Sequence, residues 1–247
     1  MTVALLLHGV PETAAIWNDL AAELGDDVRA LALPGFGCDT PDGFDGSMHA
    51  YAQWLTQQVQ SIAAETGGPV DLVGHDWGGI LTARLATMPP VGLRSWATDA
   101  PAALREGFRW HDLAQIWLTE GAGERFWADL LADREAAAAL LTGFGLSLEH
   151  AVELIDAADD RMVDSILRLY RSSGDLGTEW VVTAPSPVPG LVIAVADDPL
   201  VSVSANTEMA ELLGAQVAIL DHGGHFWPYE APADAAAALQ AFWTSLA

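Results

Sequence analysis

The clearest chemical pattern in this sequence is Gly-His-Asp-Trp-Gly-Gly, from Gly74 to Gly79. An apolar run at residues 70–73 precedes it, and a helical pattern begins at Ile80. A strand, a residue flanked by glycines and a helix in this order predict a sharp turn that presents the central side chain at the edge of a sheet. That side chain is Asp76, and a carboxylate beside a helix N-terminus can attack carbon without a base to activate it. The alternative interpretation is an aspartate that only caps the helix.

A second motif, His8-Gly9-Val10-Pro11, follows the first apolar run of the chain. Its glycine permits a tight turn, after which the backbone N–H of Val10 can point at a developing negative charge. The N–H of Trp77, directly after Asp76, would be the second donor. These two N–H groups are the predicted oxyanion-binding pair.

A histidine base is predicted in the His-Gly-Gly-His run at residues 222–225, after the last apolar run. The two glycines allow an unusual loop, which can bring His225 toward Asp76. A histidine there can deprotonate the water that completes a hydrolysis. His222 is the rival candidate, and a purely structural His225 is the other alternative.

The acid that would orient this histidine is predicted in the Asp-Asp-Pro run at residues 197–199, which also follows an apolar run. A carboxylate here can accept the Nδ1–H of His225. Asp198 is the first choice, and Asp197 and Asp99 remain alternatives. The order Asp76, Asp198, His225 is nucleophile, acid, base, as expected when a strand-to-helix turn carries the nucleophile.

Six short apolar runs are the predicted strands, at residues 3–7, 28–33, 70–73, 93–97, 191–196 and 216–220. Amphipathic stretches lie between several of them, at residues 16–24, 49–64 and 80–88. Apolar strands that alternate with helices predict an α/β fold with a mostly parallel, doubly wound sheet covered on both faces. Ligands of such sheets bind beyond the carboxyl ends of the strands, where the motifs above fall.

This alternation stops between about residues 101 and 189, where the pattern is helical and rich in Trp and Ala. We predict a core formed by residues 1–100 and 186–247 and a helical cap formed by residues 101–185. A proline-rich connector at residues 185–190 marks the return to the sheet. The predicted cap would then cover the sheet edge that carries Asp76.

The composition limits the partners that the chain can have. With 10 Lys+Arg, all of them Arg, against 34 Asp+Glu, the formal net charge is −24. This acidity disfavours nucleic acid and anionic membranes, which need basic surfaces. One cysteine, Cys38, excludes an internal disulfide, and the absence of metal-ligand spacings predicts neither a metal nor an organic cofactor. The N-terminus has no basic region and only a short apolar run, which predicts a cytoplasmic protein without a membrane span.

Taken together, the chain resembles the α/β-hydrolase superfamily, in its epoxide hydrolase and haloalkane dehalogenase branch. The resemblance rests on the motifs at residues 8–11, 33–37, 74–79, 198–199 and 224–226 and spans nearly the whole chain. It implies that Asp76 attacks carbon to form an alkyl-enzyme ester, which His225 and Asp198 then hydrolyse. The family usually has two further strands before the His-Gly-x-Pro strand, so the sheet is expected to be shortened at one edge.

The resemblance also indicates candidates for contact with the leaving group. Epoxide hydrolases of this branch use cap phenols as donors to the epoxide oxygen, and the predicted cap contains one tyrosine, Tyr170. His111 is the candidate for a second donor. Haloalkane dehalogenases instead hold the halide with indole N–H groups. The predicted cap offers Trp110, Trp117, Trp127 and Trp180.

We therefore predict a hydrolase that opens a small apolar epoxide at Asp76, with His225 and Asp198 activating water. The first alternative is a haloalkane dehalogenase that uses the same three residues. The second is a non-catalytic small-molecule binder on a hydrolase scaffold. A serine esterase is disfavoured because position 76 is Asp, and a fluoroacetate-type dehalogenase because Trp77 stands where that family has Arg. The sequence does not indicate the oligomeric state.

Overall fold

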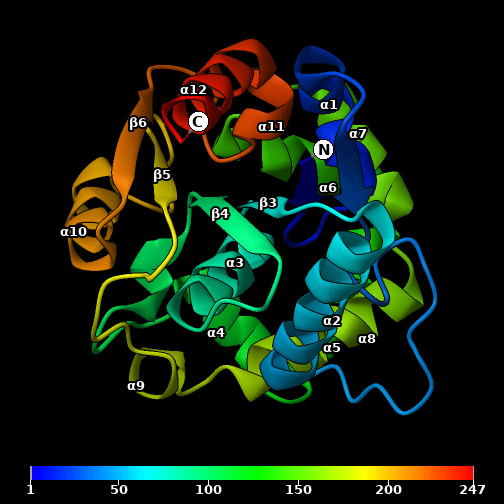
Figure 1. Ribbon diagram of the computed structural model, residues 1–247. Coiled ribbons are helices and arrows are strands. Elements are labelled where there is room, and N and C mark those ends of the chain that lie inside the picture. Colours follow the sequence, from blue (N-terminus) through cyan, green and yellow to red (C-terminus); the bar gives the residue numbers. More distant parts are fainter. Residues whose placement is uncertain (1, 247) are drawn as a thin grey trace.

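Six strands form one sheet in the computed structural model of the protein, which describes residues 2–246 (Figure 1). In spatial order they are β2 (Val28–Leu31), β1 (Val3–Leu7), β3 (Val70–Gly74), β4 (Leu93–Thr98), β5 (Gly190–Val195) and β6 (Gln216–Leu220). Every neighbouring pair is parallel. The predicted α/β architecture is therefore confirmed, with a sheet that is wholly rather than mostly parallel. Within residues 2–246 no strand lies beyond β2, in agreement with the expected shortening at that edge.

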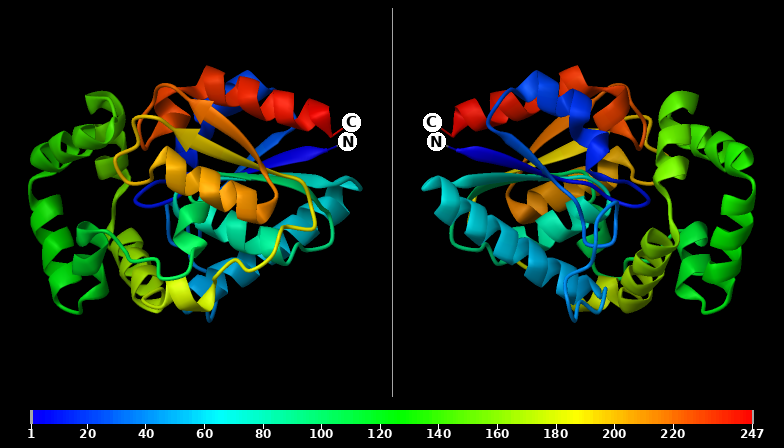
Figure 2. Two further views of the ribbon diagram at one scale, coloured as in Figure 1. Left: turned by 90° about the vertical axis from the view of Figure 1, so that its left-hand side faces the viewer. Right: turned by 90° about the vertical axis from the view of Figure 1, so that its right-hand side faces the viewer.

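Helices cover both faces of the sheet (Figure 2). One face carries α2 (Met48–Thr66), α3 (Trp77–Thr87) and α10 (Val203–Leu213). The other carries α1 (Asn18–Leu24), α11 (Trp227–Glu230) and α12 (Pro232–Ser245). A 3-10 turn, η1 (Ala14–Trp17), leads into α1, so the amphipathic stretch predicted at residues 16–24 begins as a tighter helix.

Alternate side chains of β1 pack into two hydrophobic cores, one on each face of the sheet. Leu5 and Leu7 belong to the cluster packed under α2 and α3, whereas Leu6 belongs to the cluster packed under α1 and α12. All three side chains are fully buried. Successive side chains of a strand point to opposite faces, so a strand that is buried on both faces must be apolar throughout. This is why uninterrupted apolar runs predicted the strands.

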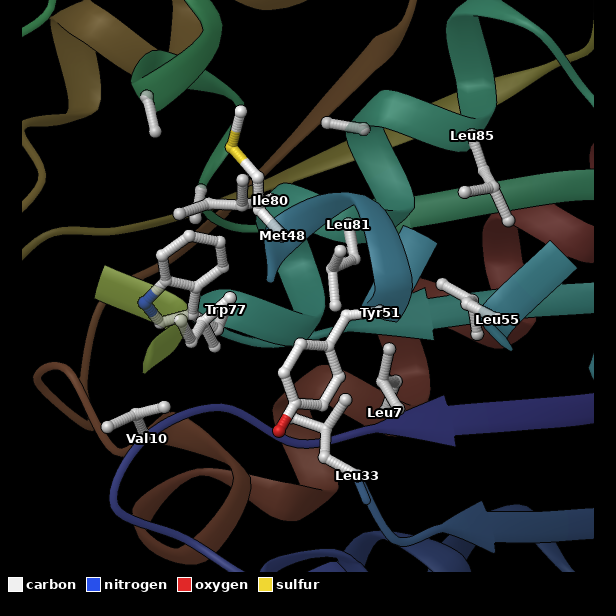
Figure 3. Packing of buried hydrophobic residues seen from close by; sticks show 14 of the residues in the cluster. Leu7, Val10, Leu33, Met48, Tyr51, Leu55, Trp77, Ile80, Leu81 and Leu85 are labelled. Carbon is white, nitrogen blue, oxygen red and sulfur yellow. The ribbon is translucent and has the colours of Figure 1, made fainter. Parts of the chain in front are cut away.

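Figure 3 shows the first of these clusters close to the carboxyl ends of the strands. Tyr51 of α2 lies beside Leu7 and Leu33, and its hydroxyl donates to the Pro34 carbonyl at 2.7 Å. Trp77, the first residue of α3, is fully buried in the same cluster. The packing of α2 and α3 thus fixes the start of α3, which is also the end of the turn that carries Asp76.

Between β4 and β5 the described chain forms helices only. They are η2 (Pro101–Leu104), α4 (Asp112–Leu118), α5 (Ala122–Ala132), α6 (Arg134–Leu141), η3 (Thr142–Phe144), α7 (Leu148–Ala157), α8 (Asp160–Ser172) and α9 (Leu176–Glu179). Figure 2 shows most of them beyond the carboxyl ends of the strands, at the end of the molecule away from both termini. Ser147 is the N-cap of α7 and Asp159 is the N-cap of α8. The side chain of each accepts a backbone N–H from the first turn of its helix. The division into a core and a separate cap stays a prediction.

No helix in residues 2–246 combines the length and the apolar character that crossing a lipid bilayer requires.

Candidate active site

Asp76 stands at the turn between β3 and α3. Its backbone has φ 49° and ψ −118°, and no other non-glycine residue within 2–246 has a positive φ. This conformation is unfavourable for a residue with a Cβ and persists only where the surrounding structure enforces it. A Cβ on Gly74 would strike the Gly78 carbonyl, and a Cβ on Gly78 would strike the Leu7 carbonyl. Asp76 makes no capping hydrogen bond to α3, so the turn presents its carboxylate rather than using it as a helix cap.

The two oxygen atoms of the Asp76 carboxylate have different surroundings. Oδ1 accepts the backbone N–H of Val10 at 2.8 Å. The backbone N–H of Trp77 also interacts with the carboxylate and lowers its pKa. Gly9 allows this approach, because a Cβ there would fall on the carboxylate itself. The predicted oxyanion donors, Val10 and Trp77, therefore both serve the carboxylate of Asp76, while its Oδ2 faces His225.

His225 approaches Asp76 from the loop after β6. Its Nε2 lies 3.9 Å from Oδ2 of Asp76, which is too far for a direct hydrogen bond. Gly223 and Gly224, with φ of 108° and 53°, give the loop a path that other residues rarely adopt. The backbone N–H of His225 donates to the Phe144 carbonyl of the predicted cap at 3.2 Å. His222, the rival candidate, is exposed.

Asp198 is the carboxylate that contacts this histidine. Its Oδ2 lies 3.0 Å from Nδ1 of His225. Its Oδ1 accepts the backbone N–H groups of Leu200 at 2.7 Å and Val201 at 3.2 Å, which fix the side chain after β5. Asp197, the neighbouring alternative, is exposed. The structure thus brings Asp76, His225 and Asp198 together at the carboxyl ends of the strands; their catalytic roles stay a prediction.

The protonation of the three residues follows from burial and from their mutual charges. Burial raises the pKa of Asp76 from 3.8 to about 6, although the charge of His225 opposes the shift. Burial alone would lower the pKa of His225, but the hydrogen bond and the charge of Asp198 outweigh it and raise that pKa above 6.5. The same hydrogen bond holds the pKa of Asp198 below 3.8 despite its burial. At neutral pH both carboxylates are therefore mainly ionised, beside a histidine whose protonated form the neighbouring Asp198 favours.

Asp99, the third candidate for the acid, belongs to a buried charge network under Asp76. Its Oδ2 lies 2.5 Å from Nδ1 of His75 and accepts the indole N–H of Trp227 at 2.6 Å, and its Oδ1 accepts the backbone N–H of Asp76 at 3.0 Å. On the other side of the ring, Nε2 of His75 is in ion-pair contact with Oε1 of Glu12 at 2.9 Å, without a well-directed hydrogen bond. Burial disfavours the imidazolium form, but the two carboxylates raise the pKa of His75 well above 6.5. The sequence analysis did not identify this network.

Glu12 extends the network to the loop that carries Val10. Its Oε2 accepts the backbone N–H of Gly9 at 2.7 Å. Burial opposes the ionised form, but the charge of His75 and its contact lower the pKa of Glu12 below 4.5. One chain of contacts therefore links the backbone of Gly9 to the backbone of Asp76, and it sets the position of the Val10 N–H relative to the Asp76 carboxylate.

His8, next to this loop, has a structural role. Its Nε2 accepts the backbone N–H of Leu33 at 3.0 Å, so its Nδ1 carries the proton and lies 2.8 Å from the Gly9 carbonyl. Burial lowers the pKa of His8 to about 4, which keeps the ring neutral. His8 thus joins the end of β1 to the loop after β2.

Two cavities meet at Asp76. The larger, about 370 Å³, lies between the core and the start of the predicted cap, and Asp76, Asp198 and His225 form its inner end. The smaller, about 60 Å³, lies between the predicted cap and the core and is mainly apolar, with Trp117, Trp127 and Phe144 in its wall. Four residues line both cavities: Asp76, His111, Leu200 and His225. A substrate at Asp76 can therefore extend in two directions.

Tyr170 of α8 lines the smaller cavity together with Asp76 and Val10. The residue is 2% exposed, and its ring packs against those of Trp77, Trp110 and Trp117. Burial, together with the charge of Asp76, raises the pKa of Tyr170 well above 10. Its hydroxyl therefore stays protonated at neutral pH and remains a hydrogen-bond donor.

His111 begins α4 and also lines both cavities. Its Nδ1 accepts the backbone N–H of Ala114 at 3.3 Å, so the proton of the neutral ring is on Nε2. Burial lowers the pKa of His111, and the charge of His225 lowers it further. The helix cap thus selects the tautomer that leaves an N–H donor on the other side of the ring.

A comparison of the whole chain with known families shows where it belongs. The profile of the alpha/beta hydrolase family matches residues 4–239. The chain belongs to the alpha/beta hydrolase family.

Solved structures and one curated relative resemble this alpha/beta hydrolase over almost its full length. Haloalkane dehalogenase DbeA from Bradyrhizobium elkani USDA94 has a TM-score of 0.72 and 22% identity, covering 99% of this chain and 91% of its own. A putative epoxide hydrolase from Pseudomonas aeruginosa has a TM-score of 0.75 and 19% identity, covering 100% and 90%. Lipase LipV from Mycobacterium tuberculosis is 27% identical over 253 residues, which are 96% of this chain and 91% of the lipase. Because these proteins have different activities by name, the reaction must be argued from the site.

Proposed function

We propose that this alpha/beta hydrolase opens epoxides through a covalent ester on Asp76. The observation that carries the proposal is the asymmetry of the carboxylate, whose Oδ1 is held by the Val10 N–H while its Oδ2 faces His225. In a serine hydrolase the oxyanion donors serve an oxygen of the substrate. Here they serve the oxygen on which charge would develop when water attacks an ester of Asp76 itself.

In the first step, Oδ2 of Asp76 attacks an epoxide carbon and the carbon–oxygen bond of the ring breaks. The proton that the released oxygen needs comes from Tyr170, with His111 as the second donor to that oxygen. Both are donors at neutral pH, because the pKa of Tyr170 lies well above 10 and the His111 ring carries its proton on Nε2. A proton donor placed in this way typically contributes ~100-fold or more to such a step.

In the second step, His225 takes a proton from water, and the resulting hydroxide attacks Cγ of Asp76. The Val10 and Trp77 N–H groups stabilise the tetrahedral oxyanion on Oδ1. The Cγ–Oδ2 bond then breaks, and the diol leaves with the proton of His225. The proton that remains on the Asp76 carboxyl returns to the Tyr170 oxygen, and the net reaction adds one water to the epoxide. The smaller, apolar cavity supports an apolar group on one side of the epoxide.

A His225→Gln variant tests the scheme, because it retains the nucleophile and lacks the base. Intact-mass measurement after incubation with a set of epoxides should show an added mass equal to one whole epoxide. Asp76→Asn in the same background should show no adduct. Absence of any adduct from a broad set of epoxides would contradict the proposal and favour the non-catalytic binder.

Haloalkane dehalogenation is the second candidate, and a separate observation favours it. Within residues 2–246, the buried indole N–H groups of Trp77, Trp117 and Trp127 have no hydrogen-bond partner. Trp117 and Trp127 also line the smaller cavity with Asp76. Such N–H groups can hold a halide ion that leaves from carbon. With haloalkanes, the His225→Gln variant would then gain the mass of the alkyl group with the halide lost.

A further inference from the structure

We propose that the larger cavity takes substrates with a carboxylate at the end of an alkyl chain, and that Arg105 and Arg109 bind this carboxylate. The inference rests on the proposed function for the reacting end of the substrate. Both arginines line the cavity whose inner end is formed by Asp76 and His225. Both are exposed, as expected of residues at a cavity mouth.

The two guanidinium groups stand out because this acidic chain gives most of its arginines a partner. Of the ten arginines, five form ion pairs with Asp or Glu side chains. Arg134 donates to the carbonyl groups of Ile155 and Ala158, and Arg84 lies over the ring of Trp180. Within residues 2–246, the remaining three, Arg105, Arg109 and Arg125, have no carboxylate within ion-pair distance. Arg125 does not line the cavity, whereas Arg105 and Arg109 do. They are therefore free to bind an anion.

The carboxylates of the cavity do not neutralise these arginines, because each has its own partners. Asp198 is bonded to His225, and Asp99 is bonded to His75 and to the backbone of Asp76. Asp76 accepts the N–H of Val10. An anionic ligand at the mouth of the cavity therefore replaces water on the guanidinium groups and displaces no existing ion pair.

The loop that carries the two arginines is held in place by the backbone. The N–H of Phe108 donates to the Arg105 carbonyl at 3.2 Å, and the N–H of Gly107 donates to the Gly177 carbonyl at 3.0 Å. Gly177 lies so close that a Cβ there would strike the backbone of Phe108. The two side chains thus extend from a turn whose backbone is anchored, so their attachment points to the cavity are fixed.

Apolar side chains form the wall between the mouth and the nucleophile. They include Ile80, Ala102, Ala103, Val201 and Ala205. Small and aliphatic side chains suit a run of methylene groups, which gains free energy as its apolar surface is buried. With a net charge of −24, the protein as a whole repels anions, so a local pair of cations is needed to admit a carboxylate. The favoured substrate is therefore a molecule with a carboxylate at one end, an epoxide at the other end and an alkyl chain between them.

A matched pair of substrates tests the inference: a medium-chain carboxylic acid with a terminal epoxide, and its primary amide. The wild type should prefer the carboxylate in kcat/KM by ~10-fold or more at low salt, mainly through KM, because a charge-assisted hydrogen bond gives about that factor. In the Arg105→Gln/Arg109→Gln double variant the ratio should fall to near one. Arg125→Gln, which changes an exposed arginine on α5 that does not line the cavity, should keep the wild-type ratio. An unchanged ratio in the double variant would overturn the inference.

Binding of octanoate and octanamide, measured by calorimetry, separates this inference from the chemistry of the site. Octanoate should bind the wild type ~10-fold more tightly than octanamide, and the double variant should lose the difference. Equal binding of the two compounds to the wild type would overturn the carboxylate site even if epoxides are opened. Selective binding of octanoate by a protein that opens no epoxide would instead overturn only the proposed reaction.

Discussion

His75 and Asp99 form a buried contact of 2.5 Å directly under the backbone of Asp76. Asp99 also accepts the N–H of Asp76, and Glu12 closes the network on the other side of the His75 ring. Asp99 therefore holds the backbone of Asp76 in position, whereas Asp198 contacts His225, which faces the Asp76 carboxylate. These two carboxylates, which follow the neighbouring strands β4 and β5, thus have different roles. Replacing Asp99 should disturb the position of Asp76, whereas replacing Asp198 should disturb His225.

Replacement of Glu12 should cost stability, because it leaves the His75 imidazolium buried with one carboxylate fewer. We expect Glu12→Gln to lower the free energy of unfolding by about 3 kcal/mol, which urea titration would measure. The pKa of Glu12 lies below its usual 4.5 and that of His75 above its usual 6.5. Glu12 therefore stabilises the fold fully above pH 4.5, and this stabilisation is lost as the pH falls through its folded pKa. His75 stabilises the fold fully below pH 6.5, and this stabilisation is lost as the pH rises through its folded pKa.

The same titration of Glu208→Gln supplies the control, because Glu208 is an exposed carboxylate on α10. This variant should unfold like the wild type at each pH. A Glu12→Gln protein as stable as Glu208→Gln would show that the buried network does not hold the fold.

Replacement of Asp198 should act on the second half of the reaction. Asp198→Asn removes the acceptor that orients His225 and supports its protonation, so hydrolysis of the ester should slow ~1,000-fold or more. The covalent adduct should then accumulate, as detected by intact mass during turnover. Asp197→Asn changes an exposed neighbour and should leave the adduct undetectable. Equal adduct levels in the two variants would assign the acid to another residue.

Formation of the ester should depend on pH through Asp76. Only the ionised carboxylate attacks, and its pKa is raised to about 6, so the rate should rise with pH around that value and level off above it. Stopped-flow measurement of the single-turnover rate would show the profile. Because the charge of His225 lowers the pKa of Asp76, His225→Gln should move the midpoint to higher pH. A midpoint near 4 in both proteins would contradict the role of burial at this carboxylate.

Replacement of Tyr170 should distinguish between the two candidate reactions. With an epoxide, Tyr170→Phe should slow formation of the ester by ~100-fold or more, because the released oxygen loses its proton donor. Tyr229→Phe provides the matched control, since Tyr229 is also buried but lines neither cavity at Asp76. With a haloalkane, Trp117→Phe rather than Tyr170→Phe should slow the reaction. Rapid-quench measurement of the adduct in all three variants would test these outcomes.

The strands, the turn at Asp76 and the order of the three site residues were predictable because local patterns carry them. A strand buried on both faces is apolar over its whole length, and the glycines around Asp76 are required by close backbone contacts. Asp198 and His225 follow predicted strands whose carboxyl ends must meet at one edge of the sheet. Nothing comparable distinguished between Asp198 and Asp99, since both follow strands and only the packing shows which one reaches His225.

No local sequence pattern indicated the buried network around His75 or the two arginines that line the larger cavity. Glu12 and His75 are 63 positions apart and meet only because β1 and β3 are neighbours in the sheet. In the sequence Glu12 is one of 34 acidic residues, and its full burial depends on this contact. For Arg105 and Arg109 the informative property is the lack of a partner, which requires the positions of all the other charges. His111 also needed the structure. The sequence suggested it as a donor, but only its capping contact with the Ala114 N–H shows that Nε2 is the nitrogen that donates.

The hydrogen bond from the His225 N–H to the Phe144 carbonyl has a consequence for engineering. Loops between strands of this fold are natural places to graft a segment from a relative and so change which substrates fit. Here a graft that changed the backbone path or the length of residues 142–146 would move the carbonyl that accepts the N–H of His225. It would also disturb the close packing of Gly145 on Gly224. Chimeras that preserve this short turn and exchange the helices on either side of it should therefore be the ones that keep their reactivity.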